Sequence, residues 1–311
     1  MDGAKINSIG DKDMDARASF FPKYFEVETI NACNARCKMC TITDWDKQDS
    51  VIMSDFLFEK FVDEVSGYSH WVETVSLNKH GEPTLDKKLA EKVRMLKRAG
   101  IKKTTFATNG QLLKPALVEA LLDAGLDDIM ISLDGITKET FEAVRVRLNY
   151  DVVLRNTLEL VRLRDQRQSD MTIRVRMVLM DENRQEFSQW LDFWKSKLSS
   201  RDQIYAKPAH TWGNQWGVEN QEKIEKYAAV PCQYLFSSMV IQVDGKVPLC
   251  AVDYNTRYLM GHFARQTIQE IWTGKASKQV RRLHTDGQRN KIRMCQGCDI
   301  WDESVKTGIG I

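Results

Sequence analysis

The chain has 311 residues, 42% hydrophobic and 28% charged, which is enough to bury the core of one large domain, alone or with a small appendage. Its 45 Lys and Arg residues lie among 43 Asp and Glu residues, so no basic surface typical of nucleic-acid or membrane binding stands out. The N-terminal residues are too polar for a secretory signal, and no segment approaches the ~18 apolar residues of a membrane span. We therefore expect a cytoplasmic protein with no membrane or nucleic-acid partner, whose seven cysteines serve as metal ligands or catalytic groups.

From about residue 24, short β-branched and aromatic runs alternate with longer segments of helical periodicity, which predicts repeated βα units around a parallel sheet. Six units are fewer than the eight of a closed barrel. We therefore expect an α/β fold, an open partial (βα)6 TIM-like barrel, with functional groups at the C-terminal ends of the strands. The predicted strands are Tyr24–Thr29, Val72–Asn78, Lys102–Thr108, Asp128–Leu133, Thr172–Met180 and Gln203–Lys207.

Two of the intervening helices carry clear signals. Ser54 precedes an amphipathic segment with aromatic residues at helical spacing and is a good N-cap. The segment Leu112–Ala124 has leucines at helical spacing and ends before Gly125. Both patterns predict helices that cover the barrel.

Beyond Ala209 the alternation changes. Short predicted strands flank a turn at Asp244 and Gly245, and helices are predicted near Ile268–Thr273 and Lys278–His284. We expect a small α+β module here. The predicted division of the chain is an N-terminal extension at 1–22, the partial barrel at 23–209 and the module at 210–311.

Three thiols lie directly after the first predicted strand. Cys33, Cys37 and Cys40 have the spacing Cys-x3-Cys-x2-Cys. Four thiolates normally saturate a 4Fe–4S cluster, so three would leave one iron open to another ligand. The alternative is a structural zinc site, which usually needs a fourth ligand; the next histidine along the chain, His70, lies beyond a predicted helix.

The spacing resembles that of the radical S-adenosylmethionine (SAM) superfamily. The resemblance implies that the amino and carboxylate groups of SAM bind the open iron and that reductive cleavage of SAM yields a 5′-deoxyadenosyl radical, which takes a hydrogen atom from the substrate. It also implies an external electron donor, such as flavodoxin or ferredoxin.

Further motifs follow successive strands in the order that the superfamily has. The segment Lys79-His80-Gly81-Glu82-Pro83 is similar to its Gly-Gly-Glu-Pro loop, with His80 in place of the first glycine. Each motif alone has an ordinary explanation as a turn or a helix cap. By the resemblance, the SAM-binding residues are Met39, Gly81, Glu82, Pro83, Thr108, Asn109, Ser132, Asp134 and Arg145.

A cation is expected near the SAM carboxylate. The candidates are Arg145, Arg147, Arg174 and Arg176, of which Arg145 and Arg176 are preferred. A buried arginine needs an anionic partner, whereas an arginine in a surface ion pair would have no such role.

The remaining cysteines are Cys232, Cys250, Cys295 and Cys298. The first two flank Gly245 in a Cys-x12-Gly-x4-Cys pattern, and the last two form Cys-x2-Cys. This layout resembles the twitch module, the shortened relative of the SPASM domain, and implies one auxiliary 4Fe–4S cluster. A four-cysteine zinc site is the alternative.

The cysteine layout most resembles that of small twitch-containing alcohol dehydrogenases of aminoglycoside biosynthesis. It implies oxidation of a sugar or aminocyclitol alcohol to a ketone, with the auxiliary cluster as electron acceptor. The base candidates are His80, His210 and Arg176.

Three alternatives stay open at this point. Many SPASM and twitch proteins modify ribosomal peptides, and a radical SAM epimerase would need a free cysteine, for example Cys250. A zinc-binding scaffold without enzymatic activity is the third. Trp212 and Trp216, beside His210, could either stack on a substrate or pack at a hinge.

Overall fold

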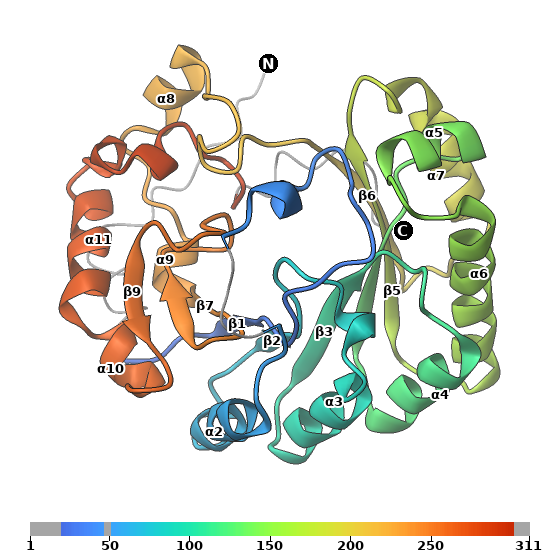
Figure 1. Ribbon diagram of the computed structural model, residues 1–311, viewed down its shortest axis with the longest axis horizontal. Coiled ribbons are helices and arrows are strands. Elements are labelled where there is room, and N and C mark those ends of the chain that lie inside the picture. Colours follow the sequence, from blue (N-terminus) through green and yellow to red (C-terminus); the bar gives the residue numbers. More distant parts are fainter. Residues whose placement is uncertain (1–19, 47–50, 302–311) are drawn as a thin grey trace.

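The computed structural model of the chain describes residues 20–46 and 51–301 (Figure 1). Its main feature is a seven-stranded sheet in the order β6-β5-β4-β3-β2-β1-β7, in which every neighbouring pair is parallel. The six predicted strands and the α/β class are confirmed, and most of the predicted N-terminal extension lies outside the described residues. The strands are β1 (Tyr24–Val27), β2 (Thr74–Ser76), β3 (Lys103–Thr108), β4 (Asp128–Ser132), β5 (Thr172–Leu179), β6 (Gln203–Pro208) and β7 (Ser238–Ile241).

The seventh strand was not predicted as part of the barrel. β7 comes from the C-terminal segment and pairs with β1, Tyr24 opposite Ser238 and Val27 opposite Ile241. The predicted turn at Gly245, which has φ +85°, leads from β7 to β8 (Lys246–Pro248), and β8 pairs antiparallel with β9 (Leu259–His262). The small module is therefore joined to the barrel through the main sheet.

Helices surround the sheet and the module (Figure 1). The two predicted helix signals are confirmed, since the hydroxyl of Ser54 accepts the backbone N–H of Leu57 at 3.2 Å and Gly125 ends α4 with φ +82°. The α-helices are α2 (Asp55–Ser66), α3 (Leu89–Arg98), α4 (Pro115–Ala124), α5 (Lys138–Val144), α6 (Tyr150–Gln166), α7 (Phe187–Lys195), α8 (Gln221–Tyr227), α9 (Tyr234–Ser237), α10 (Ile268–Trp272) and α11 (Lys275–Thr285). The 3-10 helices are Thr41–Asp44, Pro83–Leu85, Arg184–Glu186, Arg289–Lys291 and Arg293–Cys295.

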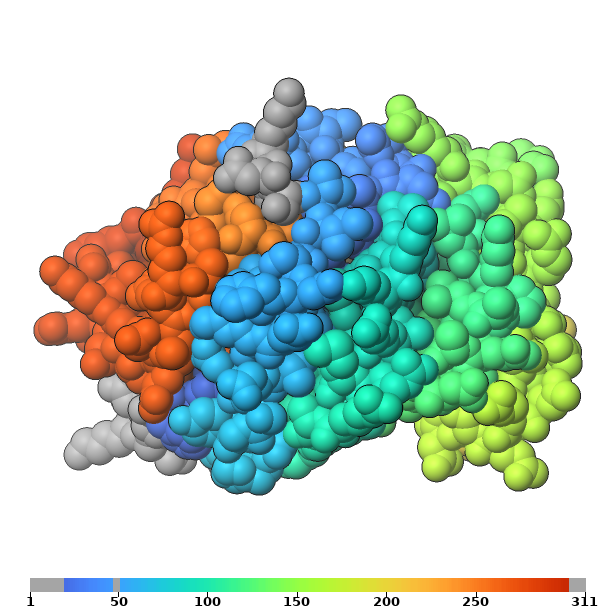
Figure 2. Space-filling view, turned by 60° about the horizontal axis from the view of Figure 1, so that its bottom comes forward, coloured from blue at the N-terminus to red at the C-terminus, as the bar shows by residue number. Residues whose placement is uncertain are grey.

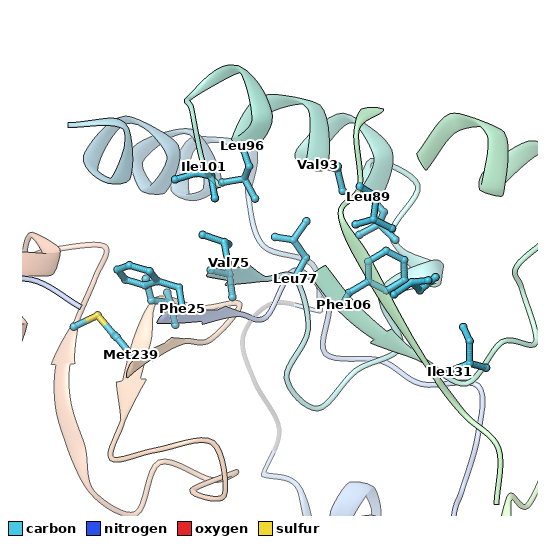
Figure 3. Packing of buried hydrophobic residues seen from close by; sticks show 14 of the residues in the cluster. Phe25, Val75, Leu77, Leu89, Val93, Leu96, Ile101, Phe106, Ile131 and Met239 are labelled. Atoms are coloured by element: carbon cyan, nitrogen blue, oxygen red, sulfur yellow. The ribbon is translucent and has the colours of Figure 1, made fainter. Parts of the chain in front are cut away.

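The hydrophobic core lies between the sheet and the outer helices. Figure 3 shows Phe25, Val75 and Phe106, from three successive strands, on the side of the sheet where α3 contributes Val93 and Leu96. Because side chains alternate along a strand, the residues next to these in each strand face the inside of the barrel. That inner face carries the polar groups of the site described below.

The module also contacts the barrel through helix α2. The ammonium of Lys60 donates to the carbonyl of Gln266 at 2.9 Å, and the N–H of Ile268 donates to Glu64 at 2.7 Å. Figure 2 shows the C-terminal residues, in orange, directly against this blue part of the surface. Within the described part of the chain, no helix is both long enough and apolar enough to cross a bilayer.

Candidate active site

The two cysteine sets line one cavity. Its volume is about 520 Å³, and its walls come from the loops after the barrel strands and from the C-terminal module. All of the cysteines are free thiols that line this cavity, namely Cys33, Cys37, Cys40, Cys232, Cys250, Cys295 and Cys298. Sequence spacing predicted two sets, and the structure places both on the wall of the same cavity.

The first set lies on the loop after β1. The N–H of Ala35 donates to the Cys33 sulfur at 3.4 Å, and the Arg145 guanidinium donates to the Cys37 sulfur at 3.4 Å. Burial raises the pKa of the Cys33 thiol to about 11. Thiolates at this position therefore require compensating positive charge, which a bound iron–sulfur cluster supplies, so the donor set fits such a group.

The loop after β2 passes very close to the first cysteine loop. A Cβ at Gly81 would lie 2.0 Å from the carbonyl oxygen of Ile30, so this position requires glycine. The backbone N–H of Glu82 donates to the carbonyl of Ala32 at 2.8 Å. The departure from the family motif at His80 therefore leaves this close approach intact.

The Glu82 carboxylate organises the ends of β2 and β3. Its Oε1 accepts from the hydroxyls of Thr84 and Thr108, each at 2.6 Å, and its Oε2 accepts the backbone N–H of Asn109 at 2.8 Å. The Asn109 amide donates to Asn34, within the first cysteine loop, at 2.8 Å. Glu82 thus fixes the residues around the cavity, and Oε2 keeps a position that can accept one further donor.

The predicted residues after β4 separate into two roles. Ser132 lines the cavity and accepts from Arg176 at 3.3 Å. Asp134 is fully buried behind the wall and accepts from Arg145 at 2.5 Å. Asp134 therefore holds Arg145 beside Cys37 and is not itself among the cavity-lining residues.

The four candidate arginines also differ. Arg174 is paired with Asp128, and Arg147 is exposed and outside the cavity wall. Arg176 lines the cavity, and its buried Nε has no hydrogen-bond partner among the described residues. Arg145, Arg174 and Arg176 all line the cavity, and of these three Arg174 has its charge balanced by Asp128 while Arg145 contacts the first cysteine set.

The two histidines proposed as bases are poor proton acceptors at neutral pH. His80 is buried with Nδ1 3.5 Å from Glu28, and burial, followed by the charge of Lys79, lowers its pKa to about 4. Nδ1 of His210 accepts the N–H of Trp212 at 3.1 Å, and burial lowers the pKa of His210 to about 4. Both imidazoles line the cavity as neutral groups.

Of the two tryptophans at the junction, one belongs to the cavity. Trp212 lines it and donates its indole N–H to the carbonyl of Met39 at 2.9 Å, which ties the junction to the first cysteine loop. Met39 also lines the cavity, whereas Trp216 is 41% exposed and lies outside its wall.

Sequence reasoning missed a second polar cluster at the cavity wall. The hydroxyl of Tyr234 donates to Oε1 of Glu26 at 2.8 Å, and Lys79 lies near enough to lower the pKa of that carboxyl, although burial raises it overall. All three line the cavity. The sequence did carry a signal for Glu26. This glutamate lies between the buried Phe25 and Val27, in a strand that is covered on both faces, where a charged residue is unusual.

Two known protein families match the sequence. Residues 27–193 match the radical SAM superfamily, and residues 232–299 match the SPASM family, described as an iron–sulfur cluster-binding domain. The first match covers more than half of the chain. The chain belongs to the radical SAM superfamily. Both predicted cysteine sets fall within or at the edge of the matched segments, so the radical SAM and SPASM resemblances are confirmed.

Curated relatives of this radical SAM protein include the S-adenosyl-L-methionine-dependent 2-deoxy-scyllo-inosamine dehydrogenase of Niallia circulans. It is 23% identical over 286 residues, which are 91% of this chain and 94% of the relative. A probable GTP 3′,8-cyclase of Sulfolobus acidocaldarius is 37% identical over 118 residues, which are 38% of this chain and 36% of that protein. The chain thus spans about a third of the cyclase.

Solved structures of other proteins share the fold. BtrN in complex with AdoMet and 2-DOIA has a TM-score of 0.60 at 19% identity, covering 89% of this chain and 92% of that one. Streptococcus suis SuiB bound to precursor peptide SuiA has a TM-score of 0.68 at 13% identity, covering 93% and 74%. At these identities the similarity establishes a common architecture.

Proposed function

We propose that this radical SAM enzyme oxidises a small alcohol of the sugar or aminocyclitol class to a ketone, with a cluster at the second cysteine set as electron acceptor. One observation carries the proposal: all seven cysteines line a single cavity, three at one part and four at another. A substrate in this cavity would therefore share one space with both sets. Its volume is in the usual range for small-molecule sites.

The oxidation divides into three transfers. An alcohol that becomes a ketone loses one hydrogen atom from carbon, one proton from oxygen and one electron. Cys33, Cys37 and Cys40 would hold the cluster that binds SAM, and SAM bound there would supply the radical that accepts the hydrogen atom. The chain must then provide a proton acceptor and an exit for the electron.

The first part of the cavity is suited to hold SAM. Gly81 permits the close approach of the two loops, Glu82 retains an accepting position, and Arg145 lies beside Cys37. In this arrangement Arg145 balances the SAM carboxylate and Ser132 accepts from Arg176. Met39, Thr108 and Asn109 line the cavity and complete the proposed SAM contacts, together with Pro83, which begins the 3-10 helix after Glu82.

Glu26 is the best proton acceptor of the cavity. Burial raises the pKa of its carboxyl above its ordinary value, which makes it a stronger base, while Tyr234 holds Oε1. Oε2 has no hydrogen-bond partner among the described residues. His80 and His210 are weaker bases because both pKa values lie at about 4, and the guanidinium of Arg176 does not lose its proton in proteins.

The proposed electron acceptor is a cluster held by the second cysteine set. With three cysteines at the first site and four at the second, no thiol of the seven is left to return a hydrogen atom, which favours oxidation over epimerisation. We also propose two 4Fe–4S clusters per chain and an external one-electron donor such as flavodoxin or ferredoxin. The relative from Niallia circulans, which is named as a dehydrogenase of an aminocyclitol, supports the substrate class.

Turnover with a defined probe tests the proposal. Anaerobically reconstituted protein, SAM and a reductant are incubated with 2-deoxy-scyllo-inosamine and a panel of related amino sugars and polyols. Mass spectrometry then measures 5′-deoxyadenosine and ketone, which should form in equal amounts. Transfer of deuterium from the carbinol carbon into 5′-deoxyadenosine identifies the reacting position.

The alternatives give different products. An epimerase returns a hydrogen atom and leaves the substrate mass unchanged in ordinary water, whereas the proposed oxidation lowers it by two hydrogens. Modification of an added precursor peptide, with every alcohol unchanged, would favour the peptide maturase. Either result would contradict the alcohol oxidation proposed here.

A further inference from the structure

The guanidinium of Arg289 binds the backbone of the segments that carry the second cysteine set. Arg289 is 1% exposed, and it donates from Nε to the carbonyl of Cys295 at 3.0 Å and from Nη2 to that of Cys298 at 2.9 Å. Its Nη1 donates to the carbonyl of Val230, two residues before Cys232, at 2.8 Å. One side chain therefore joins the backbone segments that carry three of the four cysteines.

No carboxylate balances this charge. Across residues 20–46 and 51–301, no Asp or Glu oxygen lies within ion-pair distance of Arg289, whereas the buried Arg164 pairs with Asp202 at 2.7 Å and Arg145 pairs with Asp134. His284, which accepts the N–H of Cys232, is no counter-ion because a histidine is neutral or positive. A guanidinium keeps its proton in proteins, so a buried one requires a nearby anion.

The second cysteine set is the anion that the fold places there. A 4Fe–4S cluster with four thiolates carries net negative charge in its ordinary oxidation states, and its reduction potential depends on nearby charge and hydrogen bonding.

We propose that Arg289 is a positioning residue whose buried positive charge stabilises the reduced state of the second cluster and raises its potential, so that this cluster receives the electron from the substrate. The inference rests on the second cluster of the proposed function. One-electron reduction adds negative charge to the cluster, and a fixed cation in a medium of low dielectric constant favours the more negative state. Arg289 thereby sets the direction of electron flow without touching the substrate.

An EPR-monitored redox titration of the full-length, anaerobically reconstituted chain tests this role. The background carries Cys33→Ala, Cys37→Ala and Cys40→Ala, so that only the second site holds iron. Arg289→Gln removes the charge and keeps a hydrogen-bond donor, whereas Arg289→Lys keeps the charge. We expect Arg289→Gln to lower the midpoint potential by about 59 mV or more, a tenfold change in the equilibrium of one-electron reduction, and Arg289→Lys to stay closer to the unmodified arginine.

Arg281→Gln is the matched control. Arg281 is also buried in the module and donates to the carbonyls of Leu235 and Trp272, each at 2.8 Å. Its replacement should leave the potential unchanged. A shift as large as that of Arg289→Gln would mean general loosening of the module and would overturn the inference.

Iron content separates the remaining outcomes. An unchanged potential in an iron-loaded Arg289→Gln protein refutes the role of Arg289 while the second cluster stands. If Arg289→Gln binds no iron at the second site, full iron binding by Arg289→Lys supports the role of the positive charge. If both variants lose this iron, the proposed role of the charge is refuted, and Arg289 acts through its hydrogen bonds alone. A chain with arginine at 289 that holds no iron at the second site refutes the second cluster itself, and the inference with it.

Discussion

The phenol of Tyr234 donates to the carboxylate of Glu26 at 2.8 Å, across 208 positions of the sequence. Glu26 lies on the inner face of β1, and Tyr234 begins α9 two residues after Cys232. The pair joins the barrel to the SPASM module at the wall of the shared cavity. A proton acceptor is thus held close to the site that is proposed to take the electron.

Replacing the carboxylate of Glu26 should slow substrate oxidation while SAM cleavage continues. Glu26→Gln keeps the shape and the bond from Tyr234 but removes the base, so ketone formation should fall about 10²–10⁴-fold. Reductive cleavage of SAM should persist, since Glu26 is not among the proposed SAM contacts. The measurement is the ratio of ketone to 5′-deoxyadenosine; a ratio equal to that of the unmodified enzyme would exclude Glu26 as the base.

Removing the hydroxyl of Tyr234 should shift the pH profile of kcat/KM. Tyr234→Phe deletes a hydrogen bond that lowers the pKa of Glu26, so that pKa should rise further above its ordinary value. Because the base acts when deprotonated, activity rises with pH through the pKa of Glu26, and in the variant this rise should move to higher pH by roughly 0.5–1 unit. The kcat/KM profile measures the shift, and movement to lower pH contradicts the assignment.

Local signals in the sequence predicted much of the fold and the site. The cysteine spacing, the loop at Gly81 and Glu82, and the strand at 128–132 each depend on neighbouring residues, so they could be recognised without tertiary information. The structure confirms the six strands and places both cysteine sets on one cavity.

The missed features depend on contacts between distant segments. The pairing of β7 with β1 could not be predicted, because β7 is as short as a hairpin strand and its partner lies over 200 residues away. The roles of Tyr234 and Arg289 depend in the same way on which carboxylate or carbonyls the fold brings beside them. Asp134 was predicted as a SAM contact, but its side chain is fully buried, binds Arg145 and is not among the residues that line the cavity.

A side chain at Gly81 should weaken SAM binding. In Gly81→Ala the new Cβ would meet the Ile30 carbonyl oxygen at 2.0 Å and its carbon at 2.8 Å, so the two loops must separate. Gly67→Ala is the control, because its Cβ would have no contact closer than 3.8 Å. Isothermal titration of reconstituted protein should show at least tenfold weaker SAM binding for Gly81→Ala alone, and equal affinities would contradict the proposed loop geometry.

Loss of one thiol at the first site should remove one cluster and all SAM cleavage. Reconstituted protein should hold about eight irons per chain from two four-iron clusters, and Cys33→Ala about four. The variant should form no 5′-deoxyadenosine above background, because the sulfur no longer contributes to the cluster that binds SAM. Iron analysis and chromatography measure both quantities; cleavage that persists in Cys33→Ala would contradict the assigned site.

The buried pair of Arg164 and Asp202 should contribute strongly to stability. Both side chains are fully buried, and the guanidinium donates to both carboxylate oxygens at 2.7 and 2.9 Å. Asp202→Asn removes the buried carboxylate and leaves Arg164 with the half-exposed Asp165, at 2.6 Å, as its carboxylate partner, so the change should cost up to about 3–5 kcal/mol. Asp170→Asn, at an exposed pair with a separation of 3.8 Å, should cost about 0–1 kcal/mol.

The same pair has a defined pH dependence. Burial would raise the pKa of Asp202, but the hydrogen bonds from Arg164 and from backbone N–H groups outweigh it, so the pKa lies below its ordinary value of 3.8. The folded state therefore binds this proton less readily than the unfolded state, and the stabilisation is present above pH 3.8 and lost as the pH falls through the lowered pKa. Denaturation midpoints at neutral pH should separate Asp202→Asn clearly from Asp170→Asn, with the difference shrinking under acid conditions. Equal midpoints at neutral pH would show that the ion pair adds no net stability.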